Sequence, residues 1–239
     1  YVKTFREAME AIEDGAAAFA VLPIENSTAG AVDEMYDLLV EFENYIVGET
    51  VIPIRHTLSG LPGASLEEVK TVYSKGVALM QVTHFLDAHS SWQRINVANT
   101  AIAAKKVVED QDPSQAAVCS VYAAKVHGLQ VLADNINDNE HNSTRFIVVT
   151  NQKIFLKHAS KISICLEVSH ESGSLYRVLS HFIYNDLNMT KIESRPIEGR
   201  DWEYRFFIDF EGNMADGAVK NAIRGLREEC RNLRILGNY

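Results

Sequence analysis

The chain has 239 residues, 46% of them hydrophobic and 23% charged, which is the composition of a globular protein large enough for two domains. Its formal net charge of −9 and its lack of a basic cluster argue against a nucleic-acid partner, because phosphate binding depends on clustered Lys and Arg. No apolar run approaches the roughly 20 residues that span a bilayer, so no membrane partner is expected. Three scattered cysteines without a Cys-x-x-Cys pair, and a charged N-terminus unlike a signal peptide, favour a reduced, cytoplasmic protein.

Helical and strand patterns alternate through the first 150 residues. Apolar spacing predicts helices over residues 5–12, 31–39, 77–89, 100–109 and 116–127. Runs of β-branched and other apolar residues predict strands over 18–24, 45–54, 69–73 and 95–98, at Val131 and from Phe146. Pro23 is expected to end the first strand, and residues 58–65, rich in Gly and Pro, are expected to form a loop. The alternation predicts an α/β domain whose parallel or mixed sheet is covered on both faces.

The pattern changes after Thr150, where residues 151–160 are predicted to form a linker. The elements expected beyond it are a strand, a helix, two strands, a helix and a strand, over 161–169, 173–187, 189–197, 203–211, 214–230 and 233–236. A βαββαβ order over about 80 residues is that of a ferredoxin-like domain. We therefore predict two domains, 1–152 and 160–239. Because an α/β domain normally begins with a strand, we also expect the first domain to lack its opening strand upstream of Tyr1.

Polar side chains that can form hydrogen bonds adjoin the ends of several predicted strands. In chain order they are Glu25 and Asn26, then Ser74, then Asn99 and Thr100, then Thr144 and Arg145. Gln81 follows Ser74 by two helical turns, so the two side chains can share one helix face. A rigid sheet holds residues at its strand ends while a ligand can still reach them, so these positions are candidates for a binding cleft.

Each of these residues also has an ordinary structural interpretation. The alternatives are a helix N-cap for Ser74, Asn99 and Thr100, an Asx turn for Glu25 and Asn26, an ion pair for Arg145, and a solvated helix position for Gln81. The functional interpretation rests on convergence, since separate turns carry small hydrogen-bonding groups where charged side chains are usual. Neither a nucleotide fingerprint nor a hydrolase motif occurs, and the eight histidines form no pair at metal-ligand spacing. We therefore expect a site without a metal and without a cofactor.

Four stretches in the first half resemble the prephenate dehydratase family. They are VLPIENSTAG at 21–30, the spacing from Ser74 to Gln81, NTAIAA at 99–104 and NSTRF at 142–146. In the second half, ESGSLYRVL at 171–179 and KIESRP at 191–196 resemble the regulatory ACT domain of the same family. The motifs occur in the family's order and cover nearly the whole chain. Their sequences are most similar to those of the dehydratase and ACT portion of a bacterial bifunctional chorismate mutase–prephenate dehydratase.

The resemblance implies a fold, a reaction and a regulator. The fold is a two-lobed dehydratase domain like a periplasmic binding protein, with the active site between its lobes, followed by the ferredoxin-like ACT domain. The reaction is the decarboxylating dehydration of prephenate to phenylpyruvate in L-phenylalanine biosynthesis, without a cofactor. L-Phenylalanine is expected to bind between two ACT domains and to inhibit, so the protein is expected to be a homodimer or a homotetramer.

The resemblance also assigns individual residues. The catalytic residues are Thr144, which is the family's essential threonine, together with Asn26, Ser74 and Gln81. The residues expected to bind substrate are Glu25, Ser27, Thr100, Arg145 and Phe146. The residues expected to bind the effector are Gly173, Ser174, Leu175, Glu193, Ser194, Arg195 and Pro196. We expect the Thr144 hydroxyl to protonate the departing hydroxide as a general acid, and we favour Arg145 as a brace for the threonine turn over a carboxylate clamp.

Three features depart from the family pattern. The family usually opens with a Gly-rich strand and turn that this chain does not contain. It usually has His-Pro after the serine, where this chain has Lys75 and Gly76, and Ala where this chain has Ser174. Two alternatives therefore stay open, a catalytically inactive fragment and an ACT-linked sensor of a small molecule. Whether a chorismate mutase domain precedes Tyr1 is also left open.

Overall fold

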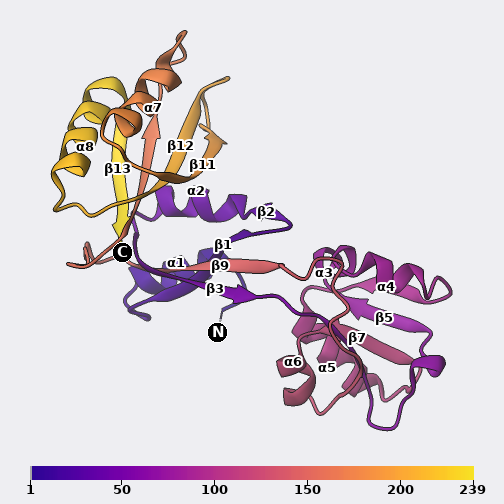
Figure 1. The fold of residues 1–239 in the computed structure, drawn as a ribbon. Coiled ribbons are helices and arrows are strands. Elements are labelled where there is room, and N and C mark those ends of the chain that lie inside the picture. The colour runs from indigo at the N-terminus through magenta and orange to yellow at the C-terminus, as the bar shows by residue number, and fades with distance from the viewer. Residues whose placement is uncertain (1) are drawn as a thin grey trace. The chain divides into compact units, whose positions relative to one another are not determined.

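The computed structural model describes residues 2–239, which form two compact units (Figure 1). The larger unit contains the chain up to Asn26, Gly30–Val51 and Arg145–Tyr239, and the smaller unit contains Ser27–Ala29 and Ile52–Thr144. Strands β3 (Tyr45–Pro53) and β9 (Ser143–Thr150) each begin in one unit and end in the other. In the part of the chain described, no helix is long and apolar enough to cross a bilayer.

The larger unit is built on one eight-stranded sheet with the order β11-β12-β10-β13-β3-β9-β1-β2. In its first half, β1 (Ala20–Asn26), β2 (Gly30–Ala31), β3 and β9 are joined by helices α1 (Phe5–Glu13) and α2 (Asp33–Glu41). The apolar side chains of α1 and α2 recur at helical spacing, so each helix buries one face. Met9, Ile12, Met35 and Leu39 pack there with Ile147 and Val149 of β9.

The second half of this sheet has the ferredoxin-like order β10-α7-β11-β12-α8-β13. Its strands, β10 (Lys161–Glu167), β11 (Met189–Pro196), β12 (Tyr204–Glu211) and β13 (Arg231–Asn238), pair antiparallel as β11-β12-β10-β13. Helices α7 (Ser174–Tyr184) and α8 (Gly217–Glu229) pack on this sheet (Figure 1). The rings of Phe182 and Phe210 meet in the core, with centroids 5.1 Å apart. The predicted βαββαβ order is confirmed.

A close approach of two strands joins the halves of the large sheet. Gly237 of β13 lies beside Ile46 of β3 in parallel register. A Cβ atom added at Gly237 would lie 2.2 Å from the carbonyl oxygen of Ile46, so only glycine allows this spacing. The same hydrophobic core runs across the junction, because Phe207, Leu236 and Tyr239 pack with residues of α2.

The smaller unit has a five-stranded sheet with the order β6-β5-β7-β4-β8. Strand β5 (Thr71–Ser74) is parallel to β6 (Gln93–Asn96) and β7 (Gln115–Cys119), whereas β4 (Thr57–Gly60) runs antiparallel to β7 and β8 (Gln130–Ala133). The connections include the short 3-10 helix η1 (Leu66–Glu68) and helices α3 (Gly76–Met80), α4 (Thr83–Asp87), α5 (Thr100–Asp110) and α6 (Val121–Val126).

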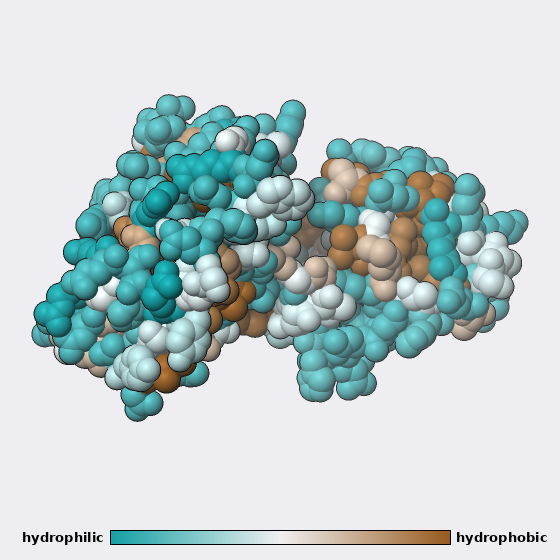
Figure 2. Space-filling model, turned by 90° about the horizontal axis from the view of Figure 1, so that it is seen from above, coloured by the Kyte–Doolittle hydropathy of each residue, from teal (hydrophilic) through white to brown (hydrophobic). Residues whose placement is uncertain are grey.

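Alternating residues of β5 and β7 enter two different hydrophobic cores, as a strand period of two requires. Val72 and Val118 pack with α4 on one face, and Tyr73 and Ala117 pack with α5 on the other. The predicted α/β sheet covered on both faces is therefore confirmed. Figure 2 also shows apolar side chains at the surface of this unit, where exposed ones include Met80 of α3.

Several predicted elements differ from the structure. Residues 57–60 form the buried strand β4 where a loop was expected, and 115–119 form strand β7 where a helix was expected. In β7 the two alanines Ala116 and Ala117 favour a helix, but they and the next two residues are fully buried in a strand between two neighbouring strands. Pro23 does not end β1, which continues to Asn26, because its fixed φ is compatible with an extended backbone.

The predicted helix 77–89 is broken in two at Gln81 and Val82. The carboxylate of Asp138 accepts hydrogen bonds from the backbone N–H groups of Thr83 (2.7 Å) and His84 (2.9 Å), which begin α4. A distant acidic side chain therefore caps a helix start that the local sequence does not mark.

Candidate functional site

The threonine of the T-R-F motif lies where the chain passes between the units. Thr144 and Arg145 are the second and third residues of β9, and not the turn before it as predicted. In the smaller unit, Ser27 N–H donates to the carbonyl of Ser143 (2.8 Å), and Ser143 N–H donates to the Ser27 hydroxyl (2.9 Å). The Ser27 hydroxyl donates to the carbonyl of His141 (3.2 Å). Ser27 thus fixes the backbone immediately before Thr144.

Ser74 is the last residue of β5 and its side chain is fully buried. Its Oγ donates to the carbonyl of Val118, at 2.7 Å, and so ties β5 to β7. The N-cap interpretation of Ser74 is wrong, because the N-cap of α3 is Lys75. The N-cap interpretation of Asn99 is confirmed, since its Oδ1 accepts from Ile102 N–H at 2.8 Å and Thr100 begins α5.

Gln81 is the C-cap that directly follows α3, so it does not lie two turns along a continuous helix with Ser74 as predicted. The residue is 9% exposed, and its Oε1 lies 3.0 Å from Nε2 of His56. Its backbone carbonyl accepts from Asp138 N–H at 2.8 Å. Burial lowers the pKa of His56, and the hydrogen bond that its ring donates to Gln81 only partly opposes this, so the imidazole is neutral at pH 7.

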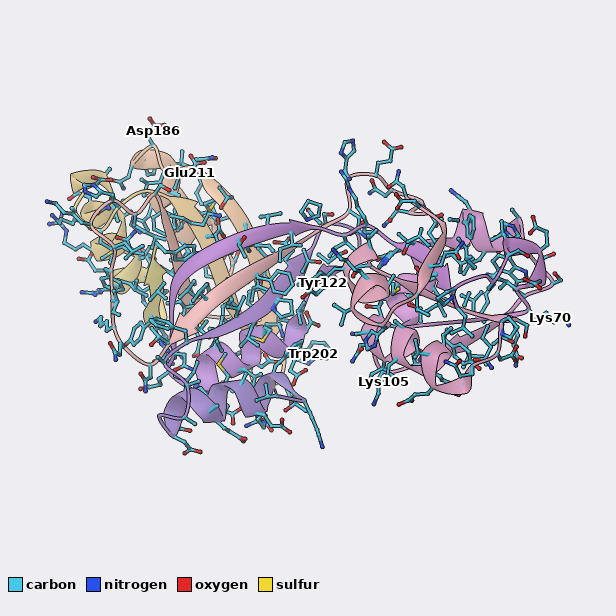
Figure 3. The ribbon with its side chains drawn as sticks, turned by 90° about the horizontal axis from the view of Figure 1, so that it is seen from below. Lys70, Lys105, Tyr122, Asp186, Trp202 and Glu211 are labelled. Carbon is cyan, nitrogen blue, oxygen red and sulfur yellow. The ribbon has the colours of Figure 1, made fainter. Side chains whose placement is uncertain are left out.

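A hollow of about 480 Å³ lies in the smaller unit. It is lined by residues 52–56, by Thr100 at the start of α5, and by Ser120, Val121 and Tyr122 at the start of α6. Tyr122 is labelled in Figure 3. Thr100 was predicted from the sequence, but His56 was missed, because its neighbours Arg55 and Thr57 form no recognisable pattern with it.

In the larger unit, Arg145 is bound by three carboxylates. Its side chain is 14% exposed and lies 2.8 Å from Asp209, 3.2 Å from Glu49 and 3.2 Å from Glu25. Although burial acts to lower the pKa of Arg145, Asp209 and Glu49 raise it above its ordinary value, so this side chain stays charged. Carboxylates from strands β1, β3 and β12 therefore hold Arg145, which directly follows Thr144.

Glu25 has a second cation beside it, because Lys191 of β11 lies 2.8 Å from its carboxylate. Burial acts to raise the pKa of Glu25, but Lys191 and Arg145 together keep it below the ordinary value. Phe146, the next predicted residue, follows Arg145 in β9 and is partly buried. Asn26 ends β1 and pairs with Gly30 of β2.

The residues predicted to bind the effector separate into two groups in this chain. Ser174 and Leu175 line a hollow of about 360 Å³ with the loop 168–172, Trp202 and Phe206. Gly173 precedes α7 with a φ of +80°, and Trp202 is labelled in Figure 3. The second group, Glu193, Ser194, Arg195 and Pro196, lies in β11.

Arg195 in that second group faces α2. Its guanidinium lies 2.6 Å from Asp33 and 2.7 Å from Asp37. Arg195 and Pro196 line a different hollow, with Asp37 and Glu41 of α2. Residues of the two predicted effector motifs therefore line two different hollows of one chain.

A family model described as prephenate dehydratase matches residues 1–154. The chain belongs to the prephenate dehydratase family. A bifunctional chorismate mutase/prephenate dehydratase from Aquifex aeolicus (strain VF5) is 38% identical to it over 238 residues, which are 99% of this chain and 65% of the relative. The chain thus spans slightly less than two thirds of that relative's length.

Two solved structures are similar over the whole chain. The prephenate dehydratase from Arthrobacter aurescens in complex with L-Phe has a TM-score of 0.91 and 32% identity, over 100% of this chain and 80% of that one. GqqA, described as a novel type of quorum quenching acylase, has a TM-score of 0.89 and 30% identity, over 99% of this chain and 86% of that one. The predicted membership of the prephenate dehydratase family is confirmed.

Proposed function

We propose that this chain is a prephenate dehydratase, a carbon–oxygen lyase that converts prephenate to phenylpyruvate, CO2 and water. The observation that carries the proposal is the family match over residues 1–154, because it spans Asn26, Ser74, Gln81 and Thr144 together. The name of the Aquifex relative, 38% identical over nearly all of this chain, supports the same reaction.

The proposed chemistry needs one acid and a site that holds the substrate. As the ring carboxylate leaves as CO2, the electrons of the broken C–C bond complete the aromatic ring and the ring C–O bond breaks. The Thr144 hydroxyl protonates the leaving oxygen, so that water departs, and it regains its proton from solvent. A threonine is a weak acid, so positioning and exclusion of water supply much of the rate.

The hydrogen bond of Ser74 narrows its proposed role. A serine hydroxyl carries one proton, and here that proton is given to the carbonyl of Val118. While this bond persists, Ser74 can accept a hydrogen bond from the substrate hydroxyl but cannot donate one to a carboxylate. Donors for the substrate carboxylates therefore come from other residues of the proposed set, which are Asn26, Gln81 and Thr100.

For Arg145 we propose the bracing role. Three carboxylates surround its guanidinium, as in an ion-pair network that stabilises a structure. A residue held from β1, β3 and β12 fixes the backbone of β9 next to Thr144. Glu25, in the same network, serves in this proposal to orient Arg145 and Lys191.

We further propose that residues 160–239 form an ACT domain and that L-phenylalanine, when bound to it, inhibits the dehydratase. The Arthrobacter structure, similar over the whole chain, was solved with L-Phe, which supports this effector. The hollow beside Ser174 and Leu175 has the aromatic wall of Trp202 and Phe206 that a phenyl ring needs. Assembly into a homodimer or homotetramer, residence in the cytoplasm and an upstream chorismate mutase domain belong to the same proposal.

The decisive test is to incubate the protein with prephenate and to follow phenylpyruvate. Thr144→Ala is expected to lower kcat by about 10²–10⁴-fold, the usual contribution of a general acid, whereas Thr144→Ser keeps the hydroxyl and should retain much of the activity. Turnover of Thr144→Ala within about tenfold of the unmodified chain contradicts the acid role. No turnover by the unmodified chain, with binding of L-Phe retained, supports the sensor alternative, and loss of both supports an inactive fragment.

A further inference from the structure

One buried titratable side chain in the smaller unit has no part in the reaction as proposed so far. His56 is 6% exposed, and its Nε2 lies 3.0 Å from Oε1 of Gln81. A carbonyl oxygen only accepts hydrogen bonds, so the ring nitrogen facing it must carry the proton. The neutral Nε2–H tautomer meets this requirement, and it fixes the Gln81 amide with its oxygen toward His56.

The backbone of both residues is bound to one segment, 136–138. His56 N–H donates to Oδ1 of Asn137 (2.6 Å), and the His56 carbonyl accepts from Ile136 N–H (3.1 Å). The same segment reaches Gln81, whose carbonyl accepts from Asp138 N–H (2.8 Å). Imidazole and amide are therefore fixed relative to each other at both the backbone and the side chain.

This arrangement also explains the position of Gln81 at a helix break. Asp138 caps the start of α4, so α3 ends at Met80 and Gln81 leaves the helix. His56 lines the hollow that also contains Thr100. A buried amide with two chemically different ends needs a partner that selects one orientation, and His56 is that partner in this structure.

We propose that His56 is a positioning residue of the dehydratase site, which orients the side-chain amide of Gln81 so that its NH2 end is directed to prephenate. The inference rests on the proposed function, because it assigns Gln81 to the substrate. His56 acts through Gln81 and takes no proton from the reaction. Without it, the amide can rotate and present its oxygen, which repels a substrate carboxylate.

The test is a double-mutant cycle with His56→Leu and Gln81→Ala, measured as kcat/KM for prephenate. Each single substitution is expected to lower kcat/KM by about 10–100-fold, as lost positioning does. The double variant should lie within about threefold of Gln81→Ala, because the two residues act as one unit. Additive losses would overturn the inference, since His56 would then act independently of Gln81.

Two further measurements separate positioning from stability and from a failure of the proposed function. His56→Gln, which can still donate toward Gln81, should recover activity to within about fivefold of the unmodified chain, whereas a purely structural role gives no such recovery. Nitrogen-15 NMR of the imidazole, in which His56→Leu assigns the signal, should show the Nε2–H tautomer. An Nδ1–H tautomer overturns the inference even if the unmodified chain does not turn over prephenate.

Discussion

The guanidinium of Arg145 is bound by Glu25, Glu49 and Asp209, which are far apart in the sequence and come from three strands. Lys161 forms a further ion pair with Glu49. Removing one member of such a partly buried network is costly, because the remaining charges lose their partners. At the residue scale, Arg145, next to the proposed acid Thr144, is therefore held by charged residues that lie outside its own sequence motif.

Glu167 offers a test of a buried ion pair by pH. It is 3% exposed and accepts hydrogen bonds from Arg205 (2.8 Å), Asn232 (2.9 Å) and Arg200 (3.0 Å). Burial acts to raise its pKa, but Arg205 and Asn232 keep it below the ordinary value of 4.5. A carboxyl with a lowered folded-state pKa contributes stability above its unfolded pKa and loses it as the pH falls through the folded value.

We therefore expect Glu167→Gln to lower the free energy of unfolding at pH 7 by about 2 kcal/mol, the effect of leaving a buried hydrogen-bonding partner unpaired. Below pH 4.5 the difference between variant and parent should shrink. Urea unfolding at pH 7 and at pH values below 4.5 measures this. Glu109→Gln, on an exposed helical pair, is the control and should change little at either pH. An equal loss at all pH values contradicts the assignment.

At the scale of elements, two sheets of the larger unit become one because β13 can lie against β3. The contact depends on Gly237, whose missing side chain leaves room for the carbonyl of Ile46. In the smaller unit the helix break at Gln81 depends in the same way on a partner from elsewhere, the carboxylate of Asp138. Single residues at element contacts thus decide where strands join and helices end.

Gly237→Ala is expected to destabilise the protein by about 1–3 kcal/mol, because the new Cβ atom overlaps a backbone oxygen and the strands must separate. The matched control is Gly217→Ala, which meets nothing within 4 Å at the start of α8. That change should be neutral or slightly stabilising, since alanine favours helix. Chemical unfolding of both variants provides the comparison, and equal stabilities would show that β13 and β3 are not held this closely.

At the scale of the whole molecule, the ferredoxin-like part of the larger unit is bound to the dehydratase part by several ion pairs, which include the pair of Lys161 with Glu49. Lys191 reaches Glu25, Asp209 reaches Arg145, and Arg195 reaches two aspartates of α2. Strand β11 carries two of these contacts as well as a predicted effector motif. An effector that binds one conformation of β11 better than another can therefore change the positions of Glu25 and Arg145.

The double change Asp33→Asn and Asp37→Asn tests this route. It leaves Arg195 without its charge partners on α2 but touches none of the residues proposed for catalysis. We expect phenylpyruvate formation without effector to stay within about twofold, and the L-phenylalanine concentration for half inhibition to change at least about fivefold, the lower range of typical allosteric coupling. Asp87→Asn, which breaks an exposed pair with Arg94, is the control. Unchanged inhibition in the double variant contradicts this route.

Local periodicity was sufficient to predict the α/β class and the βαββαβ order, because alternation and helical spacing mark which face of an element is buried. The motifs at 21–30 and 142–146 likewise placed the chain in its family. Both signals are carried by residues that are neighbours in the chain. They can therefore be recognised without knowing which elements pack together.

Tertiary structure decided what depends on distant partners. Residues 115–119 are a strand because two strands flank them, although Ala and Cys give no strand signal. His56 meets Gln81, and Arg145 meets Asp209, only once the chain has folded. Hydrogen bonds and ion pairs act over a few ångströms in space at any separation in sequence, so local patterns in a single sequence do not reveal them.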